Sequence, residues 1–338
     1  MRLFRRRDNK LSRRIERRRL QVRAFLRSYD LELVLGDPTD LPDGPILIST
    51  MRNEAVRLPY FFDYYRRLGI DRFLIIDNGS TDETPSILSD RNDVVCWRTD
   101  ASYRDSGFGV DWVNAVLNRH CDGKWILCVD PDEFLVYPHC DTRGIPALTR
   151  WLEQNRRESL ATLLIDMYGR GRVTETVYEA GQDPNLVAPW FDAGNYVTER
   201  HKRYHNLWIQ GGPRQRVIFS EQPEHAPALN KTPLVRWKSG FVFVTSTHNL
   251  LPQRLNQNYG RGPAALTSGA LLHHKFLHVL DDKVREELVR RQHYLGGMEY
   301  QSYADRGLTT ELWTEHSTQY QGWSQLCDLG LIAEGGWV

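Results

Sequence analysis

Four short apolar runs alternate with longer amphipathic segments over the first half of the chain. The runs are rich in β-branched and large apolar residues, which is typical of buried strands. In the segments between them, apolar residues recur at helical spacing. Repeated strand–helix units predict an α/β fold, a Rossmann-like, mostly parallel sheet flanked by helices. The expected strands are residues 46–49, 72–76, 94–97 and 124–129, and the expected helices are 56–68, a short one after Ser80 or Thr81, and 107–120.

The pattern also suggests how the chain is divided. Residues 36–45 are rich in Gly, Pro and Asp, which is typical of a linker. Beyond residue 138 we expect a helix at 145–155, a strand at 161–165 and a helix at 283–295. The predicted division is therefore an N-terminal segment (1–35), a central domain (46–280) and a helical C-terminal extension (281–338).

Charge is distributed unevenly along the 338 residues. The net charge is only +1, but residues 1–27 contain twelve Arg or Lys and two carboxylates, a local balance of +10. Leu11, Ile15, Val22 and Phe25 or Leu26 recur there at roughly helical spacing. This stretch is either a helix that lies on an anionic membrane surface or a solvated basic arm.

The sequence contains no apolar run of 18 residues and no signal-peptide core, so we expect no membrane-spanning helix. Its five cysteines lack metal-type spacing, which favours reduced thiols. We expect a cytoplasmic protein, held at the inner face of the membrane if the basic segment binds lipid.

Three carboxylates follow the fourth apolar run. Asp130, Asp132 and Glu133 come directly after residues 124–129, and Pro131 cannot continue a central strand. The carboxyl ends of strands in an open α/β sheet are where ligands bind. An oxygen cluster of this charge suits a hard divalent cation, Mg²⁺ or Mn²⁺, bound together with substrate phosphates. The alternative is a solvated acidic turn.

Two stretches together resemble a known family. They are TMRNEAVRLPYFFDYYRRLGIDRFLIIDNGSTDET, from residue 50, and WILCVDPDEFL, from residue 125. The combination resembles the inverting family 2 glycosyltransferases of GT-A fold, and most closely the bacterial branch whose first motif is RNE. Softer matches are LIDMYG, GGPRQRVIF, PLVRW, STH and ALLHHKF, so that the resemblance spans about 46–280.

The resemblance implies an enzyme that moves a sugar, with inversion, from a nucleotide-diphosphate donor, UDP-sugar in the first instance. The acceptor would be a glycan or a lipid-linked sugar, as in bacterial surface polysaccharide synthesis, and no nucleic acid partner is implied. Asp130 and Asp132 would hold Mn²⁺ or Mg²⁺, and His273 would complete the metal shell, with His248 as the second choice. The resemblance places Thr50, Arg52 and Glu54 around the nucleotide, and Asp77, at the end of an expected strand, suits the ribose or the base. Arg214, in the pair of arginines at 211–216, would meet the diphosphate or an acidic acceptor unless these arginines are simply solvated. Lys275, beside His273, would meet the diphosphate.

The general base is harder to assign from sequence. Asp166 follows the expected strand 161–165 and is our first choice, while Asp192 and Glu224 stay open. Glu133 would be a metal ligand or would orient one.

Two other functions remain. A sugar-phosphate nucleotidyltransferase would share the nucleotide-binding sheet, but it usually needs a Gly-rich phosphate loop after the first strand. Residues 50–59 contain no glycine, which counts against it. The other alternative is a non-catalytic carbohydrate-binding protein of the same fold, which the intact Asp-Pro-Asp sequence argues against.

Overall fold

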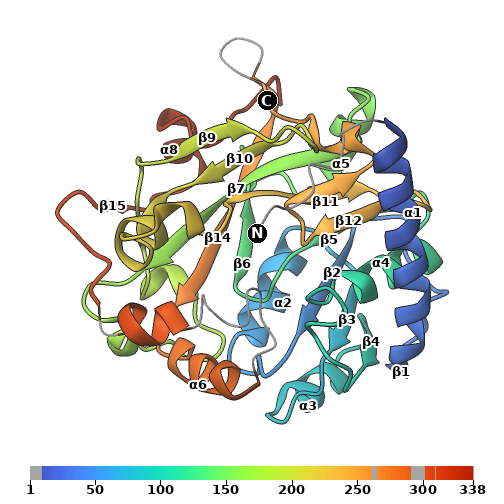
Figure 1. Cartoon of the computed structure of the whole chain (residues 1–338), viewed down its shortest axis with the longest axis horizontal. Helices are drawn as coiled ribbons and strands as arrows, with labels where there is room; N and C mark the ends of the chain where they lie inside the picture. Colours follow the sequence, from blue (N-terminus) through green and yellow to red (C-terminus); the bar gives the residue numbers. More distant parts are fainter. Residues whose placement is uncertain (1–9, 261–264, 291–300, 309, 338) are drawn as a thin grey trace.

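The structure is a computed structural model that describes residues 10–260, 265–290, 301–308 and 310–337. The first half of its central sheet is parallel and is built from the apolar runs of the sequence (Figure 1). The strands are β2 (Ile46–Met51), β3 (Phe73–Asp77), β4 (Val94–Arg98) and β5 (Trp125–Cys128), in the spatial order β4-β3-β2-β5. Helices α2 (Leu58–Arg67), α3 (Thr84–Ser89) and α4 (Val110–His120) connect them. The predicted α/β class, with these four strands and three helices, is confirmed.

The second half of the sheet is mixed. β11 (Asn230–Arg236) is antiparallel to both β5 and β7 (Ser159–Tyr168), and β14 (Ser268–Phe276) is parallel to β7. The far edge is β6 (Glu133–Val136), antiparallel to β14. We expected β7, although it is longer than predicted, but not β6, β11 or β14.

Two apolar layers sandwich the parallel strands. Because side chains alternate along a strand, Leu47 and Phe73 face one layer while Ile48 and Leu74 face the other. The first layer is completed by α2, α5 (Ile145–Gln154) and α8 (Trp323–Asp328), and the second by α4. α2 and α4 therefore bury an apolar face, as their helical spacing predicts, and the short α3 adds Leu88 to the first layer.

The basic N-terminal segment is an integral part of this body. It forms α1 (Lys10–Arg27), which packs on α4 and on β12 (Val242–Thr245), with Leu20 and Ala24 buried. The Nε atom of Arg23 lies 2.7 Å from a carboxylate oxygen of buried Asp111. Glu16 accepts hydrogen bonds from Arg203 and Tyr204. After α1, β1 (Glu32–Leu35) adds to the sheet beside β4.

The C-terminal segment is also tied to the body. β15 (Thr318–Gln319) pairs with β8 (Trp190–Phe191), which itself pairs with β7. Leu326, Ile332 and Trp337 belong to the same core cluster as α2. The expected boundaries at 35, 46 and 280 stay sequence predictions, but the described contacts cross all of them.

The helix expected at 283–295 corresponds to α6 (Leu280–Arg290), and the remainder of that prediction lies outside the described residues. Two small antiparallel pairs complete the fold: β9 (Val197–Arg200) with β10 (Leu207–Gln210), and β12 with β13 (Asn249–Leu251). Within the part of the chain that the structure describes, no helix is long and apolar enough to cross a membrane.

Candidate active site

The candidate site lies where the strand order reverses. β3 and β4 lie to one side of β2, and β5 lies to the other, so the connections leaving β2 and β5 diverge. In open α/β sheets, ligands bind outside the carboxyl ends of the strands at such a switch point. Thr50, Arg52 and Glu54 lie at or after the end of β2, and Asp77 ends β3. Asp130 and Asp132 follow β5.

Asp77 is fixed in place by the turn that follows it. Its side chain is buried, and its Oδ1 atom accepts hydrogen bonds from the backbone N–H and the hydroxyl of Ser80. Thr50, on the neighbouring strand β2, pairs with Ile76, the residue before Asp77. Its Oγ1 atom is buried without a hydrogen-bond partner in the described residues. A Cβ atom at Gly109 would lie only 3.3 Å from that oxygen, and Gly109 has a φ of +77°, so glycine is needed there.

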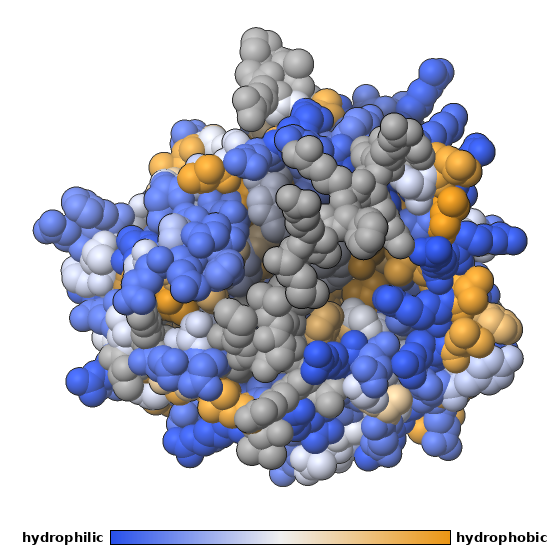
Figure 2. Space-filling view, in the orientation of Figure 1, coloured by the Kyte–Doolittle hydropathy of each residue, from blue (hydrophilic) through white to orange (hydrophobic). Residues whose placement is uncertain are grey.

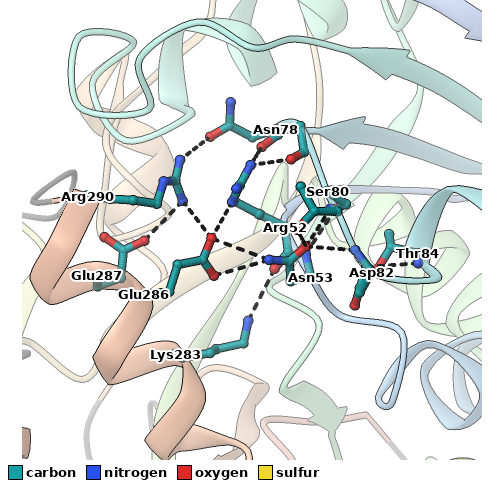
Figure 3. A network of polar contacts seen from close by, with 12 residues as sticks. Arg52, Asn53, Asn78, Ser80, Asp82, Thr84, Lys283, Glu286, Glu287 and Arg290 are labelled. Carbon is teal, nitrogen blue, oxygen red and sulfur yellow. Dashed lines mark hydrogen bonds and ion pairs between the residues drawn. The ribbon is translucent and has the colours of Figure 1, made fainter.

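Helix α6 lies across the loop after β2 (Figure 3). The Nε atom of Arg52 donates to Glu286 at 2.6 Å, and its Nη1 atom donates to the carbonyl oxygens of Asn78 and Gly79. Glu54 forms an ion pair with Lys283. Helix α6 therefore holds Arg52 and Glu54 in place, and the turn after β3 holds Asp77. The position of α6 beside this loop was not predicted from the sequence.

On the other side of the switch point, His273 lies between two aspartates. Its Nδ1 atom is 2.7 Å from Oδ1 of Asp166, and its Nε2 atom is 3.4 Å from Oδ2 of Asp132. The strand register explains this, because β14 pairs His273 with Asp166 of β7 and with Glu133 of β6. Despite the opposing effect of burial, the two carboxylates raise the pKa of His273, and His273 in turn holds the pKa of Asp132 well below its usual range.

Asp166 does not have the surroundings of a general base. Its side chain is 1% exposed and accepts from Nε of Arg214 at 2.7 Å as well as from His273. Burial acts to raise its pKa, but Arg214 and His273 together lower it below the ordinary value. A buried carboxylate that already accepts from Arg214 and His273 is a poor proton acceptor for a substrate hydroxyl. In this geometry Asp166 fixes the His273 ring through a hydrogen bond, and its role as general base stays a sequence prediction.

Asp166 also determines the position of Arg214, which we expected to meet the diphosphate. The Arg214 side chain is 4% exposed and lies in the wall of the site, paired with Asp166. Lys275 is half-buried, with its Nζ atom 4.7 Å from the centre of the Tyr303 ring.

The other two candidates for the base lie in different surroundings. Asp192 is buried and accepts two hydrogen bonds from Arg216, at 2.9 Å each, and one from the Tyr168 hydroxyl. Glu224 is exposed on a short turn. Of the three carboxylates, Glu224 alone keeps an exposed side chain.

Lys231 is the site residue that sequence reasoning missed. It lies on β11, its side chain is 6% exposed, and its Nζ atom contacts Glu133 closely and Asp130 at 3.4 Å. Burial raises the pKa of Glu133, and Lys231 opposes that rise. The available signal was a polar stretch, Asn-Lys-Thr-Pro at 230–233, between apolar residues that are typical of a strand.

The side chains present fit a divalent cation in part. Across the described ranges, no group of three or more His, Cys, Asp or Glu side chains is arranged to hold an ion. Two ligands bound to one ion at roughly 2.1 Å each lie about 3 Å apart, so the 3.4 Å separation of His273 and Asp132 fits such a pair. Asp130 faces Lys231 instead, with a side chain that is 55% exposed.

His248, the second choice for a metal ligand, is held elsewhere. Its Nδ1 atom lies 2.6 Å from the carbonyl oxygen of Asn230, to which the ring N–H donates. Burial, with smaller contributions from Lys231 and Arg214, lowers the pKa of His248 to about 4. Two neighbouring cations make this position less suitable for a metal than that of His273.

No family model and no curated protein matches the chain. Solved structures with some likeness include a mannosyltransferase from Pyrobaculum calidifontis in complex with GDP-Man and Mn²⁺, with 17% identity, a TM-score of 0.27 and an alignment over 49% of this chain and 47% of that one. Another is a 4-diphosphocytidyl-2C-methyl-D-erythritol synthase, with 15% identity, a TM-score of 0.25 and 42% and 66% of the two chains. A third is HddC from Yersinia pseudotuberculosis, with 8% identity, a TM-score of 0.32 and 72% and 99%.

The aligned part of this chain thus spans less than half of the mannosyltransferase. At these TM-scores the likenesses establish neither a family nor an activity.

Proposed function

We propose that this protein is an inverting glycosyltransferase that takes a sugar from a nucleotide-diphosphate donor, UDP-sugar in the first instance. The observation that carries the proposal is the meeting of two groups at one switch point. The β2 loop and Asp77 lie on one side, and His273 and Asp132 lie on the other. The first group suits the nucleoside, and the second suits the diphosphate with its counter-ion.

In the proposed reaction, an acceptor hydroxyl attacks the anomeric carbon of the donor. The new C–O bond forms as the bond to the diphosphate oxygen breaks, the hydroxyl proton passes to a base, and the nucleoside diphosphate leaves. Asp132 and His273, joined by Asp130 once it turns from Lys231, would hold Mn²⁺ or Mg²⁺. Such an ion supplies positive charge where the leaving group becomes negative.

The other residues position these groups. Asp166 holds His273 so that Nε2 points toward Asp132. Thr50, Arg52, Glu54 and Asp77 would surround the nucleoside. The base stays open, and Glu224 is its most accessible candidate.

The acceptor we propose is a glycan or a lipid-linked sugar, of the kind used in bacterial surface polysaccharide synthesis. The reaction would then take place on the cytoplasmic side of a membrane.

The test is a screen of nucleoside diphosphates for thermal stabilisation with and without Mn²⁺ or Mg²⁺, followed by turnover of the corresponding nucleotide sugars. Stabilisation should depend on the metal and should disappear in Asp132→Asn, while Asp328→Asn, an exposed aspartate far along the chain, should behave as wild type. Consumption of a nucleoside triphosphate with a sugar phosphate would replace the proposal by a nucleotidyltransferase. Sugar binding without any turnover would indicate a non-catalytic binding protein.

A further inference from the structure

The large apolar side chains that are exposed are concentrated in one part of the molecule. Thirteen such side chains are exposed among the described residues, and eight of them lie between residues 11 and 34, on α1, on the turn after it and on β1. Figure 2 shows apolar side chains along the margin where α1 lies in Figure 1. The eight residues are Leu11, Ile15, Val22, Phe25, Leu26, Tyr29, Leu33 and Val34.

The five apolar residues of α1 form one continuous stripe. At 100° per residue, they fall within about 100° of the helix circumference, and the centre of that arc is nearly opposite Leu20 and Ala24. Leu20 and Ala24 are the side chains that α1 buries against the body. We call the stripe of Leu11, Ile15, Val22, Phe25 and Leu26 the α1 outer face.

Positive charge borders this face. Arg14, Arg18 and Arg19 are exposed and lie at or beside the stripe. The one carboxylate of α1, Glu16, is turned inward, where it accepts hydrogen bonds from Arg203 and Tyr204. The outer surface of α1 therefore combines apolar side chains with arginines and carries no carboxylate.

We propose that the α1 outer face binds an anionic lipid bilayer. An apolar stripe with arginines along it is the pattern of a helix that lies in the plane of a membrane surface. Arginine side chains at such positions reach the lipid phosphates with their guanidinium groups, while their methylene groups lie along the apolar surface. A second copy of the chain is a less suitable occupant, because pairing two such faces would bring like charges together.

The contacts of α1 with the body give this binding a defined geometry. Arg23 pairs with Asp111 of α4, and Gln21 donates to the carbonyl oxygen of Gly240 in the turn before β12, so the inner side of α1 is anchored at two separate places. A bilayer bound on the outer side would hold the whole body in one orientation. The inference concerns membrane binding alone and does not depend on the proposed transfer reaction.

The experiment uses full-length protein and sedimentation with vesicles, one set of phosphatidylcholine alone and one containing phosphatidylglycerol. We expect binding to the anionic vesicles at low salt, weaker binding at high salt, and none to neutral vesicles. Phe25→Ser with Leu26→Ser should lower the binding constant tenfold or more. Arg14→Gln and Arg18→Gln should each lower it about fivefold.

The matched control is Val197→Ser with Leu329→Ser, which removes two exposed apolar side chains elsewhere and should leave binding unchanged. Circular dichroism checks that each variant is folded, as expected for exposed positions. Failure to bind anionic vesicles at low salt would overturn the proposal, and so would equal binding by the Phe25→Ser, Leu26→Ser protein. A dimer in sedimentation equilibrium that the same variant abolishes would assign the face to self-association instead.

Discussion

The Nδ1 atom of His273 lies 2.7 Å from the Oδ1 atom of Asp166, so one ring nitrogen of this histidine is committed to a carboxylate. The other nitrogen, Nε2, faces Asp132. A carboxylate behind a metal-binding histidine fixes the ring and raises its basicity. The same pair explains why Asp166 is better suited to orienting His273 than to accepting a proton from substrate.

Asp166→Asn should therefore weaken Mn²⁺ binding by about 10- to 100-fold, measured by calorimetric titration below the melting temperature. The control is Asp192→Asn, which removes another carboxylate–arginine pair, more exposed than that of Asp166, without touching His273. Both changes should lower the melting temperature, and only the first should change metal affinity. Equal metal affinity in the two variants would contradict the orienting role.

Lys231→Met should destabilise the fold by about 3 kcal/mol, because it leaves the buried Glu133 carboxylate without its cation. Adding Glu133→Gln should restore most of the loss, which denaturant unfolding of the two variants would measure. Lys238→Met is the control, since its pair with Glu158 is half-exposed and should cost less than about 1 kcal/mol. A loss of that small size in Lys231→Met would show that the buried pair is not structurally important.

Arg52 and Glu286 should have opposite effects on nucleotide affinity. If Arg52 contacts the nucleotide, Arg52→Gln should weaken UDP binding about tenfold or more, as expected for a charged hydrogen bond. Glu286→Gln should strengthen it several-fold, because it releases the arginine from its ion pair. Isothermal titration calorimetry measures the UDP affinity of both variants. The control is Arg285→Gln, which removes an ion pair with Asp281 on the same helix. Equal weakening by both changes would instead make α6 part of the binding surface.

His248 should make the protein sensitive to acid. Its pKa is lowered from 6.5 to about 4 in the fold, so below pH 6.5 the unfolded chain binds a proton that the native state does not. Stability is therefore lost as the pH falls from 6.5 toward 4, by up to about 1.4 kcal/mol per pH unit for this one group. His248→Gln should remove that part of the slope in urea unfolding between pH 7 and 4.5. An unchanged slope would show that the fold does not lower the pKa of His248.

The sequence was sufficient to predict the half of the fold whose strands are uninterrupted apolar runs. β2 and β3 are buried along almost their whole length, and their polar residues, Ser49, Thr50 and Asp77, come only toward the carboxyl ends. β11 and β14 were missed because they carry Lys231, His273 and His274, which point into the site or the core and break the apolar run. The residues that give these strands a chemical role are the ones that obscure them.

The sequence was sufficient to place site residues at the ends of strands, but not to predict which side chains form ion pairs with one another. Parallel strands bring Asp77, Asp130 and Asp132 to one edge of the sheet. By contrast, the ion pairs of Asp166 with Arg214 and of Asp130 with Lys231 join positions 48 and 101 residues apart, which periodicity does not reveal. For the same reason the choice between a helix and a solvated arm stayed open for the segment of α1, and its docking was not predicted, since charged contacts such as Arg23 with Asp111 secure it.

The order of the strands in the sheet has a consequence for how the chain folds. β6 begins one residue after Asp132, yet among the described strands it pairs with β14 alone, more than a hundred residues later. Closing so long a loop lowers the conformational entropy of the chain before the stabilising contacts form, and this slows folding. Asp132 and His273 therefore meet only at a late step, so a chain that has formed its parallel half alone would already have the loop after β2 but not the contact between Asp132 and His273.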